Sequence, residues 1–234
     1  MAGIVAADAD FMIHSLTKLH LFGQEVYLTT THVSLLIVCV ALIVFAVVIK
    51  CKLKDTDEPG RFQNAVELVV ETLDNMVKSS MGKHAVRYRN YIGTLFIFLL
   101  FSNISGLLGL RPPTADYGVT FPLGVISFCL IQYNNIRWNK TRAFTDLFKP
   151  IPVLFPINLI GEIAVPFSLS LRLFGNIVSG TVIMALIYGL LNKFAYLWPG
   201  FLHAYFDLFS GAIQTYVFCM LTMVFISQKI PENN

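Results

Sequence analysis

A charged residue, Arg172, stands in the middle of a long apolar stretch that covers residues 157–191. Placing a guanidinium at the depth of a lipid bilayer costs about 2.5–3.5 kcal/mol even on a lenient insertion scale. The polar edges of the stretch are several helical turns away, so this side chain extends to the membrane surface only with difficulty. A cation kept in such a place faces a polar cavity or a partner charge. We therefore favour a functional role for Arg172 over the alternative, a buried ion pair that holds helices together.

The composition is that of an integral membrane protein. Of the 234 residues, 56% are hydrophobic and 13% are charged. A soluble domain carries about 25% charged residues. The net charge of +3 is too small and too scattered to indicate nucleic-acid binding. No pair of cysteines has metal-ligand spacing, so we expect no metal ion and no cofactor.

Three apolar runs are each long enough to cross the hydrocarbon core as an upright helix. They cover residues 33–49, 91–110 and 117–136. Between the first two, residues 62–78 alternate apolar and polar side chains with a helical period. This pattern predicts an amphipathic helix at the membrane surface or against a partner protein.

The last two apolar stretches, 157–191 and 203–228, differ from the first three. The first of them would measure roughly 50 Å as one helix, against a hydrocarbon core of about 30 Å. It must therefore be strongly tilted or broken, and Pro166 should kink it. We expect an all-α integral membrane protein with about three upright spans, one surface helix and two long tilted antiparallel helices.

Basic residues gather in two loops, which predicts the orientation of the chain. One set lies between the first two spans and the other follows the third: Lys50, Lys52, Lys54, Arg61, Lys83, Arg87 and Arg89, then Arg137, Lys140, Arg142 and Lys149. Basic loops stay in the cytoplasm. We therefore expect residues 1–31, which lack the features of a signal peptide, to form a polar, partly ordered tail outside the cell. Residues 32–234 form a single membrane domain with a cytoplasmic C-terminus.

A polar stripe follows Arg172 along its helix. Residues three and four apart share a helix face, and the members of this one are Ser168, Gly175, Asn176 and Ser179. Small residues allow close helix packing, which would be the simpler explanation if Arg172 were absent. With the arginine present, the stripe can also line a wet path.

The final stretch repeats this pattern. Its polar face carries Asp207, Ser210, Gly211 and Gln214, with His203 one turn before Asp207. Asp207 is near the outer end, where a carboxylate can simply sit at the membrane surface. Gln214 is deeper, and an interhelical hydrogen bond explains it as well as a functional role does. Glu162, about three turns before Arg172 on the cytoplasmic side, also fits an ordinary surface position.

Asp207, His203 and nearby groups form an outer polar zone, and Glu162 marks an inner one. Arg172 lies between the two zones. That layout suits an ion path that does not run straight through the membrane. Arg172 is not the carrier, because a guanidinium stays protonated in proteins. It can attract a mobile carboxylate, by about 4 kcal/mol at 4 Å and an effective dielectric near 20. Its own stripe offers no carboxylate, so we expect the counter-charge to come from another subunit.

The segment INLIGEIAVPFSLSLRLFGNIVSG resembles the signature of subunit a of F-type rotary ATP synthases. FQNAVELVVETLDNMV, FLLFSNISGLLGL, PPTADYGVTFPL and GAIQTYVFCMLTMVFIS also resemble that family, so that the likeness covers most of the chain from about Arg61 onward. The resemblance implies a bacterial plasma-membrane subunit that forms two half-channels against a rotating ring of c subunits. It also implies contacts with the b subunits of the peripheral stalk through the surface helix and cytoplasmic loops.

The resemblance carries over to individual positions. Residues that match the family pattern are Arg172, Asn176, Gln214, Glu162 and Asp116. Thr181 departs from it, because many bacterial members carry a glutamate there that lines the outer half-channel. We hypothesise that Asp207, on the facing helix, replaces that glutamate. The coupling ion, proton or sodium, stays open.

Two other functions compete with this interpretation. A stand-alone secondary transporter or channel is disfavoured because the chain has no inverted repeat. A structural scaffold would leave Arg172, Asp207 and Gln214 unexplained. Since no GxxxxGKS/T loop is present, we expect no nucleotide site within this chain.

Overall fold

The structure, a computed structural model, describes residues 15–21, 24–53, 60–108, 110–139, 148, 152–191, 201–202 and 204–230. In this part of the chain, five helical stretches are long and apolar enough to cross a membrane. Its main helices are α1 (Thr30–Lys52), α2 (Arg61–Met81), α3 (Ala85–Ile104), α4 (Tyr117–Asn139), α6 (Phe155–Leu191) and α8 (Gly211–Gln228). The predicted class, an all-α integral membrane protein, is confirmed.

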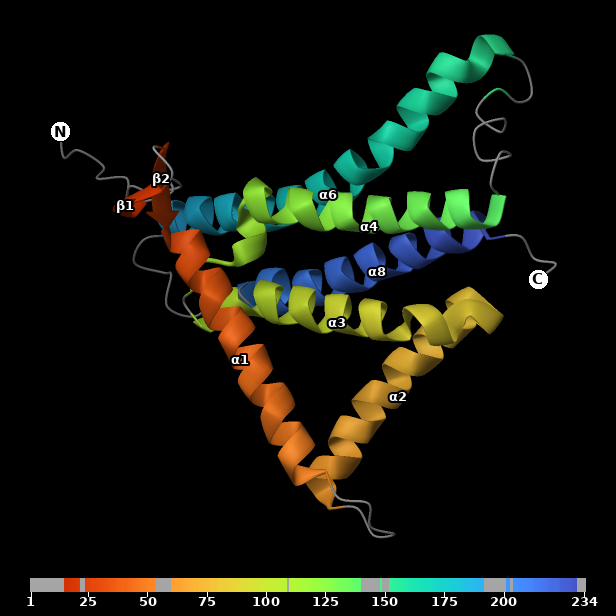
Figure 1. Cartoon of the computed structure of the whole chain (residues 1–234). Helices are drawn as coiled ribbons and strands as arrows, with labels where there is room; N and C mark the ends of the chain where they lie inside the picture. Colours follow the sequence, from red (N-terminus) through yellow and green to blue (C-terminus); the bar gives the residue numbers. More distant parts are fainter. Residues whose placement is uncertain are drawn as a thin grey trace.

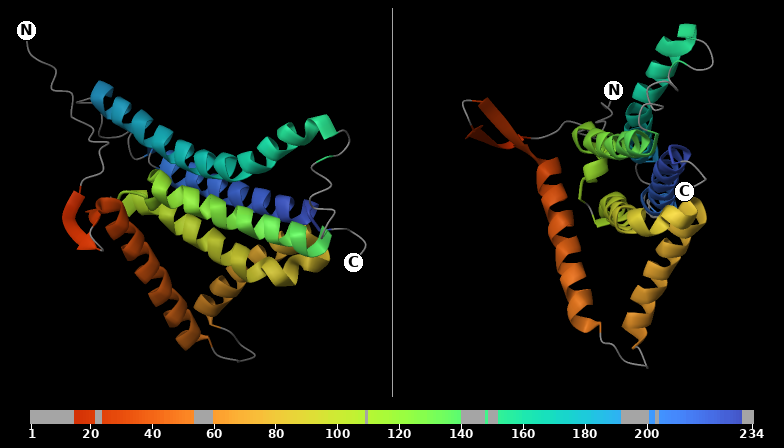
Figure 2. Two further views of the ribbon diagram at one scale, coloured as in Figure 1. Left: turned by 45° about the horizontal axis from the view of Figure 1, so that its top comes forward. Right: turned by 45° about the vertical axis from the view of Figure 1, so that its right-hand side comes forward.

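Figure 1 shows α3, α4 and α8 running side by side, with α6 lying over α4 and α8. Successive helices of this group alternate in direction, so α6 and α8 are antiparallel as expected. Helix α1 lies obliquely to the group, and Figure 2 shows α1 and α2 splayed away from it. Helices α3 and α4, which correspond to the second and third apolar runs, therefore lie along the two long helices. They do not form a set of three upright spans with α1, as the sequence had suggested.

A small β-hairpin precedes α1. Strands β1 (Ser15–Leu21) and β2 (Gln24–Thr29) pair in antiparallel register, with Leu19 opposite Val26. From the sequence alone, only a partly ordered tail is expected over residues 1–31. The segment SLTKLHL alternates polar and apolar residues, a pattern that favours a strand, but the run is short.

Helix α1 is apolar on all sides and packs little against the rest of the chain. Leu36, Ile43 and Val44 are 63%, 63% and 55% exposed. A helix that is apolar all round is stable only where something apolar surrounds it. Because little of the described part of the chain covers these side chains, α1 has the character of a lipid-facing membrane span.

The expected surface helix over residues 62–78 corresponds to α2. Its C-terminal half packs on α3 and α8 through Leu73, Val77 and Met81, which are buried. Gly82 then ends the helix with φ at +54°, in the left-handed region that glycine adopts without strain. A short 3-10 turn, Gly82–His84, leads into α3. Helix α3 starts at Ala85 and so includes Arg87 and Arg89, which belong to the basic connector (residues 83–90) before the predicted second span.

The core lies between α3, α8 and α6. Its fully enclosed side chains include Ile92 and Leu99 of α3, Leu173 of α6, and Phe218 and Met223 of α8. Because α3 and α8 are in direct contact, the start of α8 is held in a fixed position relative to α3 and α6. That position places the polar residues described below.

Helix α6 bends near its middle, as Figure 2 shows, and Pro166 lies inside it. A proline removes a backbone donor and clashes with the preceding turn, so it bends a helix. The bend fits against α4 at Gly124, where an added Cβ would lie 2.7 Å from the carbonyl oxygen of Pro166. Glycine at this position therefore allows α4 and α6 to approach closely.

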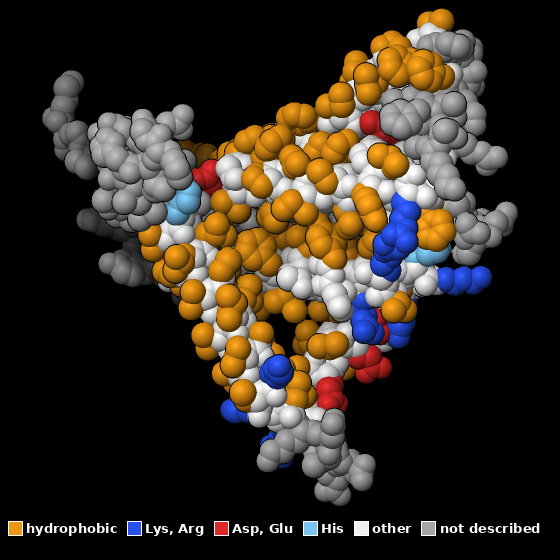
Figure 3. Space-filling view, viewed as in Figure 1, with side chains coloured by type: hydrophobic (Ala, Val, Ile, Leu, Met, Phe, Trp, Pro, Cys, Tyr) orange, Lys and Arg blue, Asp and Glu red, His pale blue; other side chains and the backbone are white. Residues whose placement is uncertain are grey.

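Charged side chains are confined to parts of the surface. Figure 3 shows an apolar band across the face formed by α1, α3 and α4, with basic groups at the junction of α2 and α3 and at the last turn of α4. The residues concerned include Lys78, Lys83 and Arg137. A further basic pair, Lys50 and Lys52, ends α1.

Candidate functional site

The polar stripe of α6 is turned outward from the helix bundle. Its exposed members are Ser168, Arg172, Gly175 and Ser179. On the opposite side of the same turns, Leu169 and Leu173 are 2% and 0% exposed. Arg172 therefore lies on an outer surface of the chain and not in its core. Because a charge in an apolar layer needs water or a counter-charge, this surface is suited to meet a polar partner.

The remaining stripe residue, Asn176, joins α6 to the beginning of α8. Its Nδ2 donates to Ser210 Oγ at 3.0 Å, and Ser210 Oγ donates to Asn176 Oδ1 at 3.3 Å. These reciprocal bonds fix the register of two antiparallel helices. Arg172 precedes Asn176 by one turn of α6, and Gln214 follows Ser210 by one turn. Because the two helices are antiparallel, both steps lead in the same direction. Arg172 and Gln214 therefore lie at the same level of the helix pair.

The amide of Gln214 is buried and incompletely bonded. The side chain is 7% exposed, and its Nε2 has no hydrogen-bond partner among the residues that the structure describes. A buried polar group without a partner destabilises a fold by about 1–3 kcal/mol. An interhelical hydrogen bond donated by Gln214 was one of the two explanations left open by the sequence, and no described residue accepts one.

Asn103 of α3 holds the start of α8 in place. Its Nδ2 donates to Gly211 O at 3.0 Å and to Thr215 Oγ1 at 3.1 Å, while its Oδ1 accepts from Thr114 Oγ1 at 2.8 Å. Asn103 is 1% exposed, so these bonds replace water entirely. A Cβ on Gly211 would lie 2.9 Å from that of Asn103, which explains the glycine.

The predicted polar face of the final stretch is divided between two neighbours. Ser210 contacts α6. Gly211 and Asp207 are instead on the α3 side, where a Cβ added to Gly106 would lie 3.5 Å from the carboxylate carbon of Asp207. The division has a simple cause, because α8 lies between α3 and α6. The turn before α8, Ala204–Ser210, is also a π-helix and not a continuation of the α-helix, so Asp207 is rotated relative to Gln214.

The outer-zone residues are only partly brought together. Thr181 is exposed and donates its hydroxyl to Val178 O at 2.8 Å. Asp207 is half-buried beside Gly106. His203 lies outside the described residues. Thr181 is thus on the exposed side of α6, while Asp207 is on the side of α3.

Asp116 begins α4. Its Oδ1 accepts a hydrogen bond of 2.8 Å from the backbone N–H of Gly118, which satisfies a free donor of the first helical turn. The same residue lines a pocket of about 350 Å³ together with His32 of α1 and Phe98 of α3. Asp116 thus has a structural role in addition to any role in ion movement.

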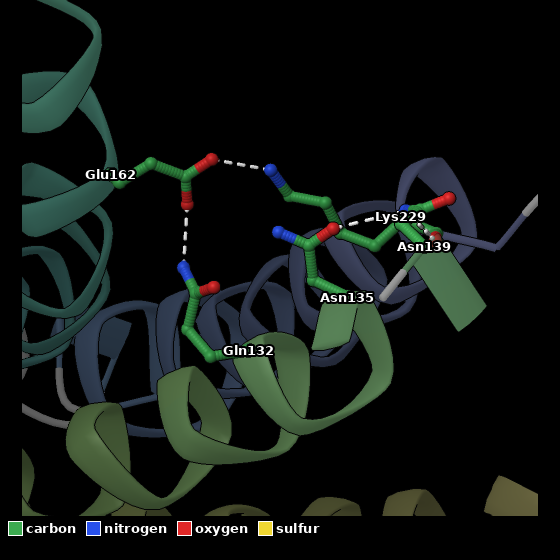
Figure 4. Close-up of polar contacts among 5 residues, drawn as sticks. All are labelled: Gln132, Asn135, Asn139, Glu162 and Lys229. Carbon is green, nitrogen blue, oxygen red and sulfur yellow. Dashed lines mark hydrogen bonds and ion pairs between the residues drawn. The ribbon is translucent and has the colours of Figure 1, made fainter. Parts of the chain in front are cut away.

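Glu162 is the centre of an inner polar cluster (Figure 4). Its Oε1 forms an ion pair with Lys229 Nζ, and its Oε2 accepts a 2.6 Å hydrogen bond from Gln132 Nε2. The three side chains come from α6, from the residue after α8 and from α4. Both carboxylate oxygens are therefore engaged, at the opposite end of α8 from Asp207.

Sequence reasoning missed Lys229, Gln132 and Asn103. An unpaired carboxylate in an apolar helix is a signal that a basic partner exists, but the partner follows α8 and lies 67 residues away in the chain. Gln132 and Asn103 lie in mainly apolar runs close to other polar residues, such as Asn134 and Ser102, so no pattern in the sequence distinguishes them. Among the described residues, no group of three His, Cys, Asp or Glu side chains could hold a metal ion.

The chain is similar to known proteins over nearly all of its length. Residues 32–227 match the family model described as ATP synthase A chain. A protein of Propionigenium modestum named "ATP synthase subunit a, sodium ion specific" is 39% identical over 191 residues, which cover 74% of this chain and 65% of that relative. ATP synthase subunit a of Priestia megaterium is 35% identical over 224 residues, covering 88% of this chain and 95% of the relative. That of Bacillus velezensis is 30% identical over 247 aligned residues.

Proposed function

We propose that this chain, which belongs to the ATP synthase A chain family, is the ion-translocating stator subunit of an F-type ATP synthase. In this role it forms two half-channels against a rotating ring of c subunits and couples ion flow to ATP synthesis. The observation that supports this most is the outward-facing Arg172, exposed at the level of the buried Gln214. A structural arginine would instead be paired inside the bundle.

Arg172 serves as the barrier between the half-channels. A fixed guanidinium repels a cation that would pass directly from one side to the other, and it attracts the ionised carboxylate of a passing ring subunit. This attraction, about 4 kcal/mol at 4 Å and an effective dielectric near 20, is small enough to be reversed when the carboxylate takes up an ion. The ring thus supplies the counter-charge that the stripe itself lacks.

The outer half-channel is lined by polar groups at the start of the α8 region and on α6. Asn176, Ser179, Gln214 and Asp207 contribute, with Thr181 and Asp116 nearer the outer surface. His203, which the sequence also suggests for this path, lies outside the described residues. The free amide donor of Gln214 can bind water in such a path. The inner half-channel ends at Glu162, whose position at the far end of α6 from Thr181 separates the two paths.

The coupling ion is a proton or a sodium ion. The Propionigenium modestum relative is named as sodium specific, whereas the names of the Priestia and Bacillus relatives specify no ion. A carboxylate can take up a proton, and carboxylate and amide oxygens can also coordinate a hard metal cation such as sodium. The ion-binding residues of the c subunit decide between the two.

The partners and the orientation follow from the same role. The uncovered half of α2, where Leu68, Val69 and Val70 are 65%, 55% and 56% exposed, is available to the b subunits of the peripheral stalk. The basic ends of α1, α3 and α4 face the cytoplasm, which leaves the N-terminus outside. No nucleotide binds to this chain, and ATP chemistry belongs to the soluble head of the complex.

Replacement of Arg172 tests the proposal in the assembled complex. In Arg172→Ala, we expect ATP synthesis and ATP-driven ion pumping to be lost, while the soluble head still hydrolyses ATP. Ser168→Ala on the same exposed face is the matched control and should retain most of both activities. ATP synthesis at the parental rate in Arg172→Ala would refute the proposal. So would purification of the chain without a c-ring in mild detergent, which a stand-alone transporter predicts.

A further inference from the structure

The carboxylate of Glu162 already holds a cation that belongs to the chain. Lys229 Nζ occupies one oxygen and Gln132 Nε2 the other, as Figure 4 shows. The side chains of Lys229 and Glu162 are 26% and 23% exposed, so water reaches both. An ion that arrives at Glu162 therefore competes with an ammonium group for the same oxygen.

The backbone around Lys229 is held firmly while its side chain is long. Asn139, the last residue of α4, donates to Lys229 O at 3.0 Å and to Asn135 Oδ1 at 3.0 Å. These bonds fix the end of α8 against α4. A lysine has a flexible four-carbon stem and a compact charge, so its ammonium can swing away from Glu162 while the backbone stays in place.

We propose that Lys229 is a tethered cation that occupies the ion-binding position of Glu162 and is displaced each time an ion passes the inner half-channel. This inference rests on the proposed function, since it requires an ion path at Glu162. The Lys229 side chain swings away, and the passing ion takes its place at the carboxylate oxygen. Gln132 keeps the other oxygen and holds the carboxylate in position during the exchange. Lys229 is thus a positioning residue that sets how readily the inner side takes up an ion.

The energetics of the pair suit such an exchange. A fully buried ion pair is hard to separate, because each charge loses its partner without gaining water. The Lys229–Glu162 pair is about one quarter exposed, so solvent screens it in part and it is weaker than a fully buried pair. An incoming ion can therefore displace the ammonium, which neutralises the carboxylate between passages.

The test uses inverted membrane vesicles that contain the assembled complex, with the inner half-channel facing the medium. ATP-driven pumping is measured as a function of the external concentration of the coupling ion, as pH for protons and as sodium concentration for sodium. Without the competing ammonium, Lys229→Met should reach half-maximal pumping at an ion concentration lower by about threefold. Lys229→Arg should resemble the parent, and Lys78→Met, which breaks a lysine–carboxylate pair on α2, is the matched control.

A double variant shows whether the shift arises at Glu162. In a Glu162→Gln background, Lys229→Met should cause no further shift, because the competition has been removed. Should Lys229→Met fail to assemble, Lys229→Gln provides a neutral side chain that still donates a hydrogen bond. A parental concentration dependence in the neutral variants overturns the inference. So does assembly that only Lys229→Arg supports, because Lys229 would then be a structural clamp.

The two proposals fail in different ways. If the parent complex pumps and Arg172→Ala does not, the proposed function stands, and an unshifted Lys229→Met removes only the tethered-cation inference. If pumping is independent of Arg172, the proposed function itself is lost. The concentration dependence of Lys229→Met reports a competition that loss of structure alone would not produce.

Discussion

Asn176 of α6 and Ser210 exchange hydrogen bonds at 3.0 and 3.3 Å, and this pair fixes the level at which Arg172 faces its surroundings. Because the two helices are antiparallel, one turn from this pair leads to Arg172 on one helix and to Gln214 on the other. Arg172, the proposed barrier, and the buried amide of Gln214 are thus positioned by the same contact. A shift of this contact would move Arg172 relative to the ring that we propose as its partner.

Loss of the Ser210 hydroxyl should weaken coupling while leaving the fold intact. Ser210→Ala removes both bonds to Asn176, each worth about 0.6–1.5 kcal/mol, so we expect coupled ATP synthesis to fall a few-fold. Ser210→Thr keeps the hydroxyl and should stay near the parental rate. The measurement is ATP synthesis in vesicles that contain equal amounts of complex. Equal losses in both variants would show that volume matters here and hydrogen bonding does not.

Gln214 and Asn103 should respond differently to replacement by leucine. Gln214→Leu removes a buried amide whose nitrogen has no described partner, so stability should change little, whereas pumping should fall at least tenfold if the amide binds water in the ion path. Asn103→Leu breaks three hydrogen bonds to Gly211, Thr215 and Thr114. It should lower the thermal unfolding temperature of the complex in detergent. Full pumping by Gln214→Leu would leave this residue with a packing role only.

The sequence predicted the long elements well because their signals are long. The apolar stretch 157–191 became α6 at Phe155–Leu191, and Pro166 marks its bend. The second run, expected to span 91–110, starts earlier, because the basic connector continues the helix from Ala85. Charged residues on a helix end at the membrane surface do not interrupt helical backbone bonds, so hydropathy alone misplaces such a boundary.

The site was predicted less completely than the fold. The stripe around Arg172 lies within one helix, where spacing in the sequence determines the shared face. Lys229 meets Glu162 only because the end of α8 returns to α6, a relation that no local pattern contains. The π-helix before α8 also rotates Asp207 away from the face that α-helical spacing gives it. Contacts between distant segments and irregular helix turns are therefore the parts that required the structure.

The close approach of α4 and α6 can be tested with glycines in two helices. Gly124→Ala would place a Cβ 2.7 Å from Pro166 O and 3.2 Å from Ser170 Cβ, so the helices must separate. We expect a destabilisation of about 1–3 kcal/mol, seen as a lower unfolding temperature of the detergent-solubilised complex. Gly93→Ala in α3 has open space around the new methyl group and should be neutral or mildly stabilising. Equal unfolding temperatures for the two variants would contradict the packing at Gly124.

The role of Asp207 in the outer half-channel can be tested together with Thr181. If Asp207 replaces a family glutamate at position 181, Asp207→Ala should reduce ATP-driven pumping at least tenfold, a loss of about 1.4 kcal/mol or more. Adding Thr181→Glu to that variant should recover part of the activity, because it returns a carboxylate to the same path. Asp74→Ala on α2 is a control for loss of a carboxylate elsewhere. Normal pumping by Asp207→Ala would exclude the replacement.

The orientation of the chain can be read from its own cysteines. Cys51 is exposed at the basic end of α1, next to Lys50 and Lys52, while Cys129 lies in the middle of α4 and Cys219 is buried. A membrane-impermeant maleimide should therefore modify Cys51 in inverted vesicles and not in right-side-out vesicles, because the proposed orientation places the basic end in the cytoplasm. Cys51→Ser should abolish the labelling. Labelling only in right-side-out vesicles would place the basic end outside, and the inner and outer polar zones would then exchange sides.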